Sequence, residues 1–371
     1  MTSPNDPARS LCNDLERRIA LTVAADLTAS ITKVDDAGLF TEVDGTPVQV
    51  MHNGVVVLRD GYLGPWQSQV INELRGHHEP QEEVVFDAIV KRLAQKKKGG
   101  GRAMLELGAW WSYYSLWFKQ AFPEAAVIGI EPDAPFLATG RRNFELNEME
   151  GTLLHGVVGP NPGEMLSFQA ASDGQFHEVR QYGLGELLAL AGVDQFDVIL
   201  ADIQGAETTF LDTSADLLRS GACRFLLVST HDPLISGSAM THRDVVAAIT
   251  ALGGHIIAEH SVSESFSGDG LVAASFHRKD RKFTVDIPHA RAVDSLFGEW
   301  EPRLATVIAE RDELQSQVNE LATELQNRIA DHERTVQYLE AVLAAERATL
   351  HRIRSTKTWR LSSRFRKPHL R

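Results

Sequence analysis

Alternating strand-like and helix-like segments between residues 103 and 276 constrain the fold more than any other feature of this sequence. Short apolar runs occur at seven places, namely 103–107, 126–131, 152–158, 196–201, 224–229, 255–258 and 271–276. Helix-like segments lie between most of these runs, at 112–121, 134–147, 184–191, 206–219 and 242–252. Strands that alternate with helices assemble into a parallel sheet with helices on both faces. The sequence therefore predicts an α/β domain over residues 99–290, with a doubly wound, mostly parallel, seven-stranded sheet.

An N-terminal extension over residues 1–98 precedes this predicted domain. Apolar residues at four-residue spacing predict a helix over 11–30, and Asn-Gly and Asp-Gly turns predict a small β-hairpin within 37–64. A second helix is expected over 79–97, because three lysines and then three glycines follow, and such residues are typical of a helix C-terminus.

A long helix without glycine is predicted over residues 300–354. Apolar residues recur there at spacings of mostly three and four, at Leu314, Val318, Leu321, Leu325, Ile329, Val336, Leu339, Leu343, Leu350 and Ile353. This spacing is typical of a coiled-coil seam, so we expect a homo-oligomer. The alternative is a single amphipathic helix that packs back on the domain. His332 occupies a seam position, and two consecutive four-residue steps around Leu325 form a stutter.

Charge and cysteine content narrow the class of protein. The net charge of −13 argues against a nucleic-acid partner, because phosphate binding needs a clustered basic surface. The two cysteines, Cys12 and Cys223, form no CxxC pattern. The polar start lacks an apolar signal core, and no apolar run is long enough to span a bilayer. These features predict a cytoplasmic chain with reduced thiols.

Two motifs indicate a nucleoside cofactor. Glu106 ends the first predicted strand of the sheet, and Gly108 follows where a strand-to-helix turn lets a ligand approach the backbone. Glu131 ends the next strand and is placed to accept hydrogen bonds from a ribose diol. A dinucleotide site needs a second glycine where this chain has Trp110, so a pyrophosphate would fit poorly. S-adenosylmethionine has no phosphate and needs only the approach at Gly108 and the acid at Glu131.

A third motif follows the strand at 196–201 and reads Asp202-Ile-Gln-Gly-Ala-Glu207. Residues at the carboxyl ends of parallel strands point into the binding crevice, so we expect Asp202 to lie in the site. For Glu207 the alternative is that it only complements the N-terminus of the next helix.

Together, the three motifs resemble the FkbM family of S-adenosylmethionine-dependent methyltransferases. The resemblance covers residues 103–276, and its most specific part is the D-x-Q-G-A-E segment. It implies that 99–290 is a methyltransferase domain of the Rossmann-like type. The chain departs from the family at Ala109-Trp110-Trp111, where the family usually has a smaller residue and a second glycine.

The resemblance also implies roles for single residues. Glu106 and Gly108 would line the methionine end of the cofactor, Glu131 would hold the ribose, and Asp202 would lie beside the reactive methyl group. The predicted cofactor-binding residues are Glu106, Gly108, Ala109, Glu131, Pro132 and Asp202.

Residues for the acceptor side are expected in three further segments. His231 ends the fifth strand and is the candidate general base, beside Asp202, because the pKa of histidine lies near neutrality. Polar clusters before the helix at 79–97 and between the last two strands are interpreted as acceptor-pocket elements. The predicted substrate-binding residues are His78, Glu79, Gln204, Glu207 and His260. No closely spaced ligand motif such as HExxH occurs, so no metal site is predicted.

The basic tail, residues 355–371, places Trp359, Leu361 and Phe365 among cations. This pattern suits an anionic membrane surface, and it is similar to the S-x-x-W-R-L endings of bacterial glycan-assembly enzymes. The alternative is a solvated tail. The sequence thus predicts O-methylation of a sugar hydroxyl in a bacterial polysaccharide or glycoconjugate, near the inner face of the membrane. Methylation of a small natural product, or a non-catalytic coiled-coil scaffold, are the alternatives.

Overall fold

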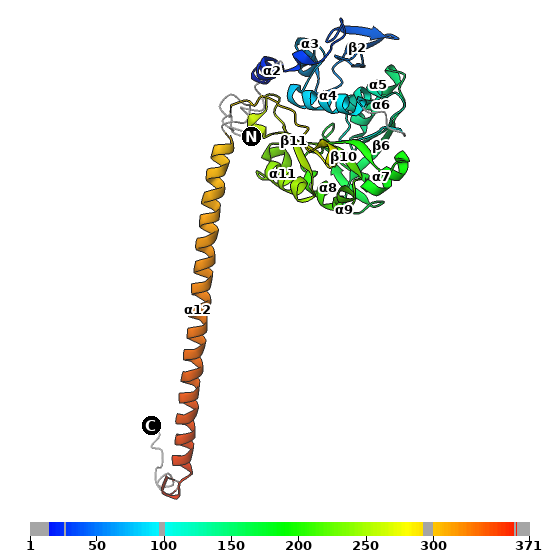
Figure 1. Ribbon diagram of the computed structural model, residues 1–371. Coiled ribbons are helices and arrows are strands. Elements are labelled where there is room, and N and C mark those ends of the chain that lie inside the picture. The colour runs from blue at the N-terminus through cyan, green and yellow to red at the C-terminus, as the bar shows by residue number, and fades with distance from the viewer. Residues whose placement is uncertain (1–14, 26, 96–100, 292–299, 360, 362–371) are drawn as a thin grey trace. The chain divides into compact units, whose positions relative to one another are not determined.

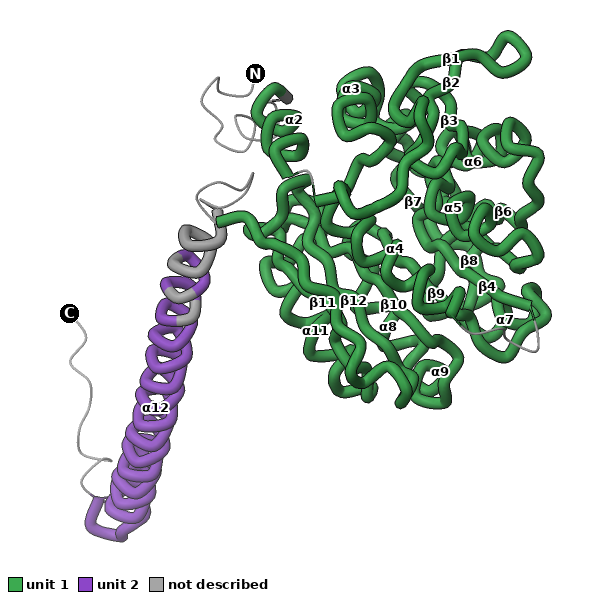
Figure 2. Tube along the Cα trace, turned by 45° about the horizontal axis from the view of Figure 1, so that its top comes forward, with its two compact units in different colours: residues 1–302 green, residues 303–371 purple. Residues whose placement is uncertain are grey.

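The computed structural model describes residues 15–25, 27–95, 101–291, 300–359 and 361. The chain divides into two compact units, residues 1–302 and 303–371, which Figure 2 shows in different colours. All described strands belong to the first unit, and the long helix α12 makes up the described part of the second. No described helix contains a stretch long and apolar enough to cross a membrane.

A nine-stranded sheet forms the centre of the first unit, in the order β11-β12-β10-β9-β4-β5-β6-β8-β7. Strand β12 is antiparallel to both of its neighbours and β7 is antiparallel to β8, whereas the other pairs are parallel. The seven predicted strands are all present, as β4 (Ala103–Leu107), β5 (Ala126–Glu131), β6 (Thr152–Val158), β9 (Phe196–Ala201), β10 (Cys223–Thr230), β11 (His255–His260) and β12 (Gly270–Ser275). The α/β prediction is therefore confirmed.

The sheet also has two strands that the apolar pattern did not predict, β7 (Met165–Gln169) and β8 (Phe176–Tyr182). Most of their side chains are exposed, so they lack the continuous apolar run of a buried parallel strand. They extend the sheet beyond β6 as a hairpin whose register pairs Phe168 with His177.

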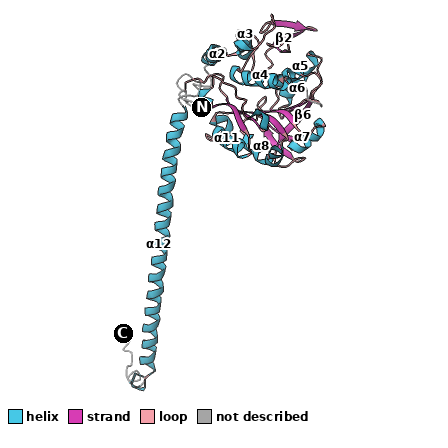
Figure 3. Cartoon of the chain, in the orientation of Figure 1, coloured by secondary structure: helices cyan, strands magenta, loops and turns pink. Residues whose placement is uncertain are grey.

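Helices cover both faces of the sheet, as Figures 1 and 3 show. Side chains of β4 alternate between two apolar cores: Met104 belongs to one, and Leu105 to the other. The first core includes residues of α4 (Pro80–Ala94), α5 (Tyr113–Ala121) and α6 (Ala134–Leu146). The second includes residues of α7 (Leu184–Ala191), α8 (Glu207–Thr213), α9 (Ala215–Ser220) and α11 (Thr241–Ala251). The segment predicted as one helix over 206–219 is thus two helices, interrupted at Ser214.

The N-terminal residues pack on this domain within the same compact unit. They form α2 (Leu15–Ala24), η1 (Thr28–Ser30), β1 (Phe40–Val43), β2 (Thr46–Val50), β3 (Val56–Leu58) and α3 (Pro65–Glu73). The predicted hairpin is an antiparallel β1-β2-β3 sheet. Asn143 of α6 and Asn147, which directly follows that helix, attach the small sheet to the domain, since their side-chain oxygens accept hydrogen bonds from the backbone N–H groups of Leu58 (2.8 Å) and Val56 (2.9 Å), respectively.

Short helices complete the first unit at the ends of β10, β11 and β12. They are α10 (Pro233–Ser236), η2 (Val262–Glu264) and η3 (Arg278–Asp280). The Asp232 side chain caps α10 by accepting the backbone N–H of Leu234 at 2.8 Å.

Helix α12 (Trp300–Ser355) is 56 residues long, which confirms the predicted long helix. The predicted seam residues are exposed within this unit, for example Leu321 at 64% and Leu325 at 59%. The partner that would cover them, and the lipid contact of the tail, stay predictions. Phe365 and most of the basic tail lie outside the described residues, as does Cys12.

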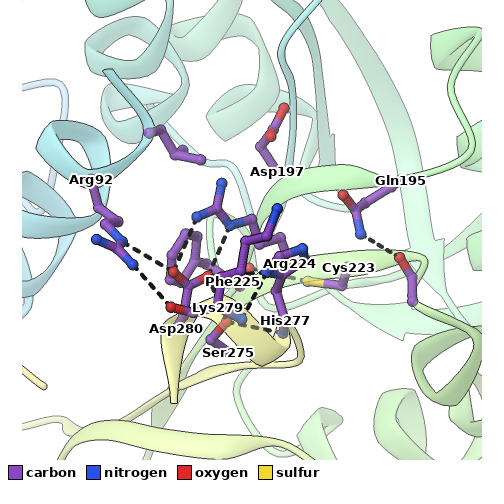
Figure 4. Close-up of polar contacts among 12 residues, drawn as sticks. Arg92, Gln195, Asp197, Cys223, Arg224, Phe225, Ser275, His277, Lys279 and Asp280 are labelled. Carbon is purple, nitrogen blue, oxygen red and sulfur yellow. Dashed lines mark hydrogen bonds and ion pairs between the residues drawn. The ribbon is translucent and has the colours of Figure 1, made fainter. Parts of the chain in front are cut away.

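Buried Asp280 ties three segments of the first unit together (Figure 4). Its carboxylate accepts hydrogen bonds from the guanidinium groups of Arg92 in α4 (3.0 Å) and Arg224 in β10 (2.9 and 3.1 Å), and from the Ser275 hydroxyl (3.2 Å). Burial opposes ionisation of Asp280, but these partners hold its pKa below the ordinary value. The carboxylate therefore joins α4 to the strands on which it packs.

We expect Asp280→Asn to lower the free energy of unfolding by about 3 kcal/mol at neutral pH, because the change leaves the partly buried guanidinium groups of Arg92 and Arg224 without their buried charge partner. The pKa of Asp280 is lower in the folded than in the unfolded chain, so the difference should shrink as the pH falls through the folded pKa. Urea denaturation of the parent protein and of Asp280→Asn at several pH values measures this difference in the free energy of unfolding. The control is Asp216→Asn in an exposed ion pair with Arg219, which should change stability by less than about 0.5 kcal/mol.

Candidate active site

A cavity of about 580 Å³ opens at the carboxyl ends of β4, β5, β6 and β9. Nine of the twelve predicted site residues line it: Glu106, Gly108, Ala109, Glu131, Pro132, Asp202, His78, Glu79 and Gln204. The other three, His231, Glu207 and His260, are buried and are not among its lining residues. The fold thus brings residues from widely separated segments to one place.

The turn after β4 packs closely against the end of β9. Gly108 has a φ of +76°, and a Cβ atom there would lie 1.7 Å from the backbone carbonyl oxygen of Asp202. The Asp202 N–H donates to the carbonyl of Leu107 at 2.9 Å. The neighbouring strand alone therefore requires a glycine here, and the approach of a ligand to Gly108, which lines the cavity, stays a prediction.

Two tryptophans follow this turn, and their rings form part of the cavity wall. Trp110 stacks on Phe136 with ring centroids 3.7 Å apart, and Trp111 stacks on Tyr62 at 4.5 Å. Trp110 has a φ of +31°, which is a strained conformation for a bulky residue. Its buried indole N–H has no hydrogen-bond partner among the described residues. The two tryptophans therefore leave the cavity open, and Trp110 adds an unpaired donor to its wall.

Glu131 lies at the end of β5 with its carboxylate held in place. Its Oε2 accepts the backbone N–H of Trp110 at 3.0 Å, and its Oε1 accepts that of Asp133 at 2.8 Å. Burial raises the pKa of Glu131 to about 7, although these hydrogen bonds favour the charged form. Each oxygen keeps a further lone pair, so the carboxylate can still accept hydrogen bonds from a vicinal diol.

Glu106 and Glu82 form a second acidic group in the cavity wall. Glu106 of β4 accepts the backbone N–H of Ser115 at 3.1 Å, and burial raises its pKa to about 8. Glu82 of α4 accepts the hydroxyl of Ser229 at 2.8 Å, and burial raises its pKa to about 7. Glu82 was not predicted as a site residue, because an acid in the first turn of a helix is usually explained by the helix dipole.

Asp202 lines the cavity, and His231 lies behind it. The His231 ring makes ion pairs with Asp202 through Nε2 (2.9 Å) and with Glu207 through Nδ1 (3.2 Å). Burial alone would lower the pKa of His231, but the carboxylates of Asp202, Glu207 and Asp269 raise it well above its ordinary value. A histidine that already carries a proton cannot accept one, so this geometry fits a residue that positions Asp202 better than the predicted general base.

Glu207 and His260 lie away from the predicted acceptor side. Both carboxylate oxygens of fully buried Glu207 accept the N–H of Gly205, at 2.9 and 3.0 Å, and one of them contacts His231. Glu207 therefore fixes the turn after β9 instead of facing the cavity. His260 is 2% exposed and bonds the carbonyl of Ser261, and burial lowers its pKa to about 4. The predicted substrate contacts of these two residues do not fit their places in the fold.

A buried carboxylate with histidines around it lies at the start of α4. Glu83 contacts the ring nitrogens of His77 and His78, and its Oε1 accepts the backbone N–H of His78 at 2.8 Å. Burial favours the neutral acid, but the two histidines hold the pKa of Glu83 well below its ordinary value. His52 brings a third ring within 4.8 Å of this group, yet both oxygens of Glu83 already have hydrogen-bond partners. We therefore assign these residues to a hydrogen-bond network.

The sheet order and the cavity at the carboxyl ends of its parallel strands are those of a doubly wound, Rossmann-like α/β fold, with the antiparallel strand β12 near one edge. No protein-family model matches the chain, and no curated protein matches it.

Solved methyltransferase structures are similar to the chain at the level of the fold. The METTL16 methyltransferase domain has 14% identity and a TM-score of 0.39, over 62% of this chain and 86% of that one. Precorrin-6y C5,15-methyltransferase from Geobacter metallireducens has 13% identity and a TM-score of 0.32, over 51% and 86%. The bifunctional kinase-methyltransferase WbdD has 14% identity and a TM-score of 0.34, over 53% of this chain and 38% of that one. The chain thus spans less than half the length of WbdD.

The raised pKa of Glu106 predicts that stability falls with rising pH. The folded chain holds the Glu106 proton up to about pH 8, whereas the unfolded chain loses it near pH 4.5. Ionisation of a buried acid therefore destabilises the fold across that window. We expect Glu106→Gln to be more stable than the parent above about pH 8, by on the order of 1–3 kcal/mol.

Thermal or urea unfolding between about pH 5 and about pH 9 measures this dependence. Exposed Glu124, changed to Gln, is the matched control and should leave the pH dependence unchanged. If the free energy of unfolding changes with pH at the same slope in Glu106→Gln and in the parent protein, the buried carboxyl is not the source of the pH dependence.

Proposed function

We propose that this chain is an S-adenosylmethionine-dependent methyltransferase that O-methylates a sugar hydroxyl of a bacterial polysaccharide or glycoconjugate. The observation that carries the proposal is the placement of Glu131, Glu106 and Asp202 around one cavity at the carboxyl ends of adjacent strands. This arrangement offers separate contacts for a ribose diol, an ammonium group and a sulfonium centre.

The residues present fit the cofactor. Glu131 has free lone pairs for a ribose diol, and the unpaired indole N–H of Trp110 supplies a donor on another residue of the cavity wall. Glu106 and Glu82, which are protonated only because they are buried, would become charged beside the methionine ammonium group. When bound, S-adenosylmethionine supplies a methyl group made electrophilic by its sulfonium sulfur.

A dinucleotide fits the same cavity poorly. None of the described residues that line it is Lys or Arg, so no cation faces a pyrophosphate. Ser112 directly before α5 has a left-handed φ of +60°, and Trp110 occupies the position of the second glycine of a phosphate loop. The cavity therefore favours a cofactor with positive charges over one with phosphates.

The acceptor side of the cavity combines carboxylates with aromatic rings. Glu79, Asp202 and Gln204 supply hydrogen-bond acceptors, while Tyr62 and Trp111 supply flat apolar surfaces. Neutral sugars present hydroxyl groups and C–H faces, so this composition suits them, and it disfavours an anionic acceptor. The resemblance of the strand-end motifs to the FkbM family, and of the tail to glycan-assembly enzymes, supports the same acceptor class.

His231 acts in this proposal through Asp202. The ion pair orients the Asp202 carboxylate at the cavity surface, where it would lie beside the sulfonium. Glu207 holds the opposite nitrogen of the same ring.

Calorimetric titration with S-adenosylhomocysteine tests the cofactor assignment. We expect binding to the parent chain, at least tenfold weaker binding to Glu131→Ala, and nearly unchanged binding to His231→Ala and to the exposed control Glu124→Ala. Binding should strengthen as the pH rises through about 7 to about 8, because Glu131 and Glu106 must ionise. Absence of heat from the parent chain at high ligand concentration would instead favour the non-catalytic scaffold.

An acceptor screen with methyl-labelled cofactor addresses the substrate in the same experiment. Transfer of label to polysaccharide or glycoconjugate fractions supports the proposed acceptor. Transfer only to small free acceptors would replace the sugar polymer with a small natural product. His231→Ala should lower turnover in either case while leaving cofactor binding intact.

We also propose that α12 joins two or more copies of this chain through its apolar seam. The seam residues are exposed along the described helix, so water faces a continuous apolar stripe unless another helix covers it. Its spacing of three and four residues matches helix-to-helix packing, and a seam of this length exceeds the few heptads that a coiled coil needs.

Sedimentation of the full chain measures this association. We expect a mass above the 40.9 kDa of one chain, which Leu325→Glu in the seam should reduce. The matched control, Gln326→Glu, adds the same carboxylate one position outside the seam and should leave the mass unchanged. A monomeric parent chain would contradict the assignment.

A further inference from the structure

The hydrogen-bond network at the start of α4 reaches the cavity through a single histidine, His78. We propose that His78 is the catalytic residue that accepts the proton of the acceptor hydroxyl, and that buried Glu83 is the positioning residue that orients its ring. This inference rests on the proposed function and adds to it the group that takes the proton.

His78 is held in one place in the cavity wall. The residue is 2% exposed, and the rings of Tyr62, Trp111, Tyr113 and Tyr114 surround it with centroids 4.9 to 5.7 Å away. Its Nε2 lies 3.6 Å from a carboxylate oxygen of Glu79, which also lines the cavity. The ring therefore cannot turn freely, and its Nε2 edge is the one that lies beside another cavity residue.

Glu83 supplies the charge behind the ring. It is fully buried, its Oε1 contacts His78 Nδ1, and its Oε2 contacts His77 Nδ1. The backbone N–H groups of His78 and Glu79 donate to the same Oε1 at 2.8 and 3.3 Å. A carboxylate with several donors stays ionised, and it selects the histidine tautomer that carries its proton on Nδ1.

That tautomer leaves the Nε2 lone pair of His78 free toward the cavity. His231 differs in two ways. Carboxylates lie within hydrogen-bond distance of both of its nitrogens, at 2.9 and 3.2 Å, whereas Glu79 lies 3.6 Å from Nε2 of His78, and the His231 ring does not line the cavity. Glu79 and Glu82 also line the cavity, and burial raises the pKa of each, so neither is the stronger base at neutral pH.

The proposed reaction transfers a methyl group from sulfur to the oxygen of the acceptor hydroxyl. The hydroxyl oxygen of the acceptor forms a bond to the methyl carbon, and the bond from that carbon to sulfur breaks. The electron pair of the broken bond stays on sulfur, which yields S-adenosylhomocysteine. The hydroxyl proton moves to Nε2 of His78, and the resulting imidazolium is stabilised by the Glu83 carboxylate.

Nitrogen-15 NMR of the histidine-labelled full chain tests the protonation of His78. His78→Gln removes one of the 14 histidine signals and thereby identifies it. We expect a neutral ring at about pH 7.5 with the proton on Nδ1, both with and without S-adenosylhomocysteine. A proton on Nε2, or a doubly protonated ring at that pH, would overturn the inference. Glu83→Gln should weaken the preference for the Nδ1–H tautomer, whereas His351→Gln in α12 is the control that should not affect it.

Kinetics with the acceptor found in the screen give a second readout. His78→Gln should lower kcat by 100-fold or more, remove the acidic limb of the pH profile of kcat, and leave S-adenosylhomocysteine binding unchanged. A variant that keeps the parent kcat and pH profile contradicts the proposal. Cofactor binding by the parent chain separates the proposed function from the assignment of His78. If the parent chain binds S-adenosylhomocysteine but His78→Gln keeps the parent kcat and pH profile, only the assignment of His78 fails.

Discussion

The site depends on the close approach of two backbone segments, the turn at Gly108 and the end of β9 at Asp202. A side chain at position 108 would collide with the Asp202 carbonyl, and the Asp202 N–H bonds the carbonyl of Leu107. The next strand joins through Gly108 and Ala109, whose N–H groups both donate to the carbonyl of Ile130. These contacts bring Glu131 and Asp202 to the same cavity, so the chemistry rests on backbone packing and not on any single side-chain pair.

The cavity concentrates carboxyl groups, and its described lining residues include neither lysine nor arginine. Burial disfavours the charged form of these acids and raises the pKa of Glu82, Glu106 and Glu131 toward or above neutrality. Part of the negative charge of the cavity is therefore absent while the site has no ligand. A cofactor with a sulfonium and an ammonium group would replace the lost hydration of these acids with charge of the opposite sign. The fold thus carries a stability cost at high pH that a cationic ligand would offset.

Two histidine–carboxylate arrangements flank this cavity and differ in what they can do. His231 lies between Asp202 and Glu207 and keeps its proton, so its effect is to hold a carboxylate in place. His78 has a buried carboxylate on one side and the cavity on the other, which leaves one nitrogen available. The two histidines differ in the acids around each ring and in whether the ring lines the cavity. Neither property can be read from residue type, so the sequence pointed to His231.

The sequence by itself determined the order of strands and helices, because buried parallel strands leave apolar runs and their helices leave 3.6-residue periodicity. It also located Glu106, Glu131 and Asp202, since acids at the carboxyl ends of buried strands have few structural roles. Only the tertiary structure decided that β7 and β8 extend the sheet, because exposed strands lack an apolar run. It likewise decided that Glu82 lines the cavity while Glu207 and His260 do not. Those outcomes depend on how α4 and the turn after β9 pack against the sheet, and contacts between segments far apart in the chain leave no local pattern in the sequence.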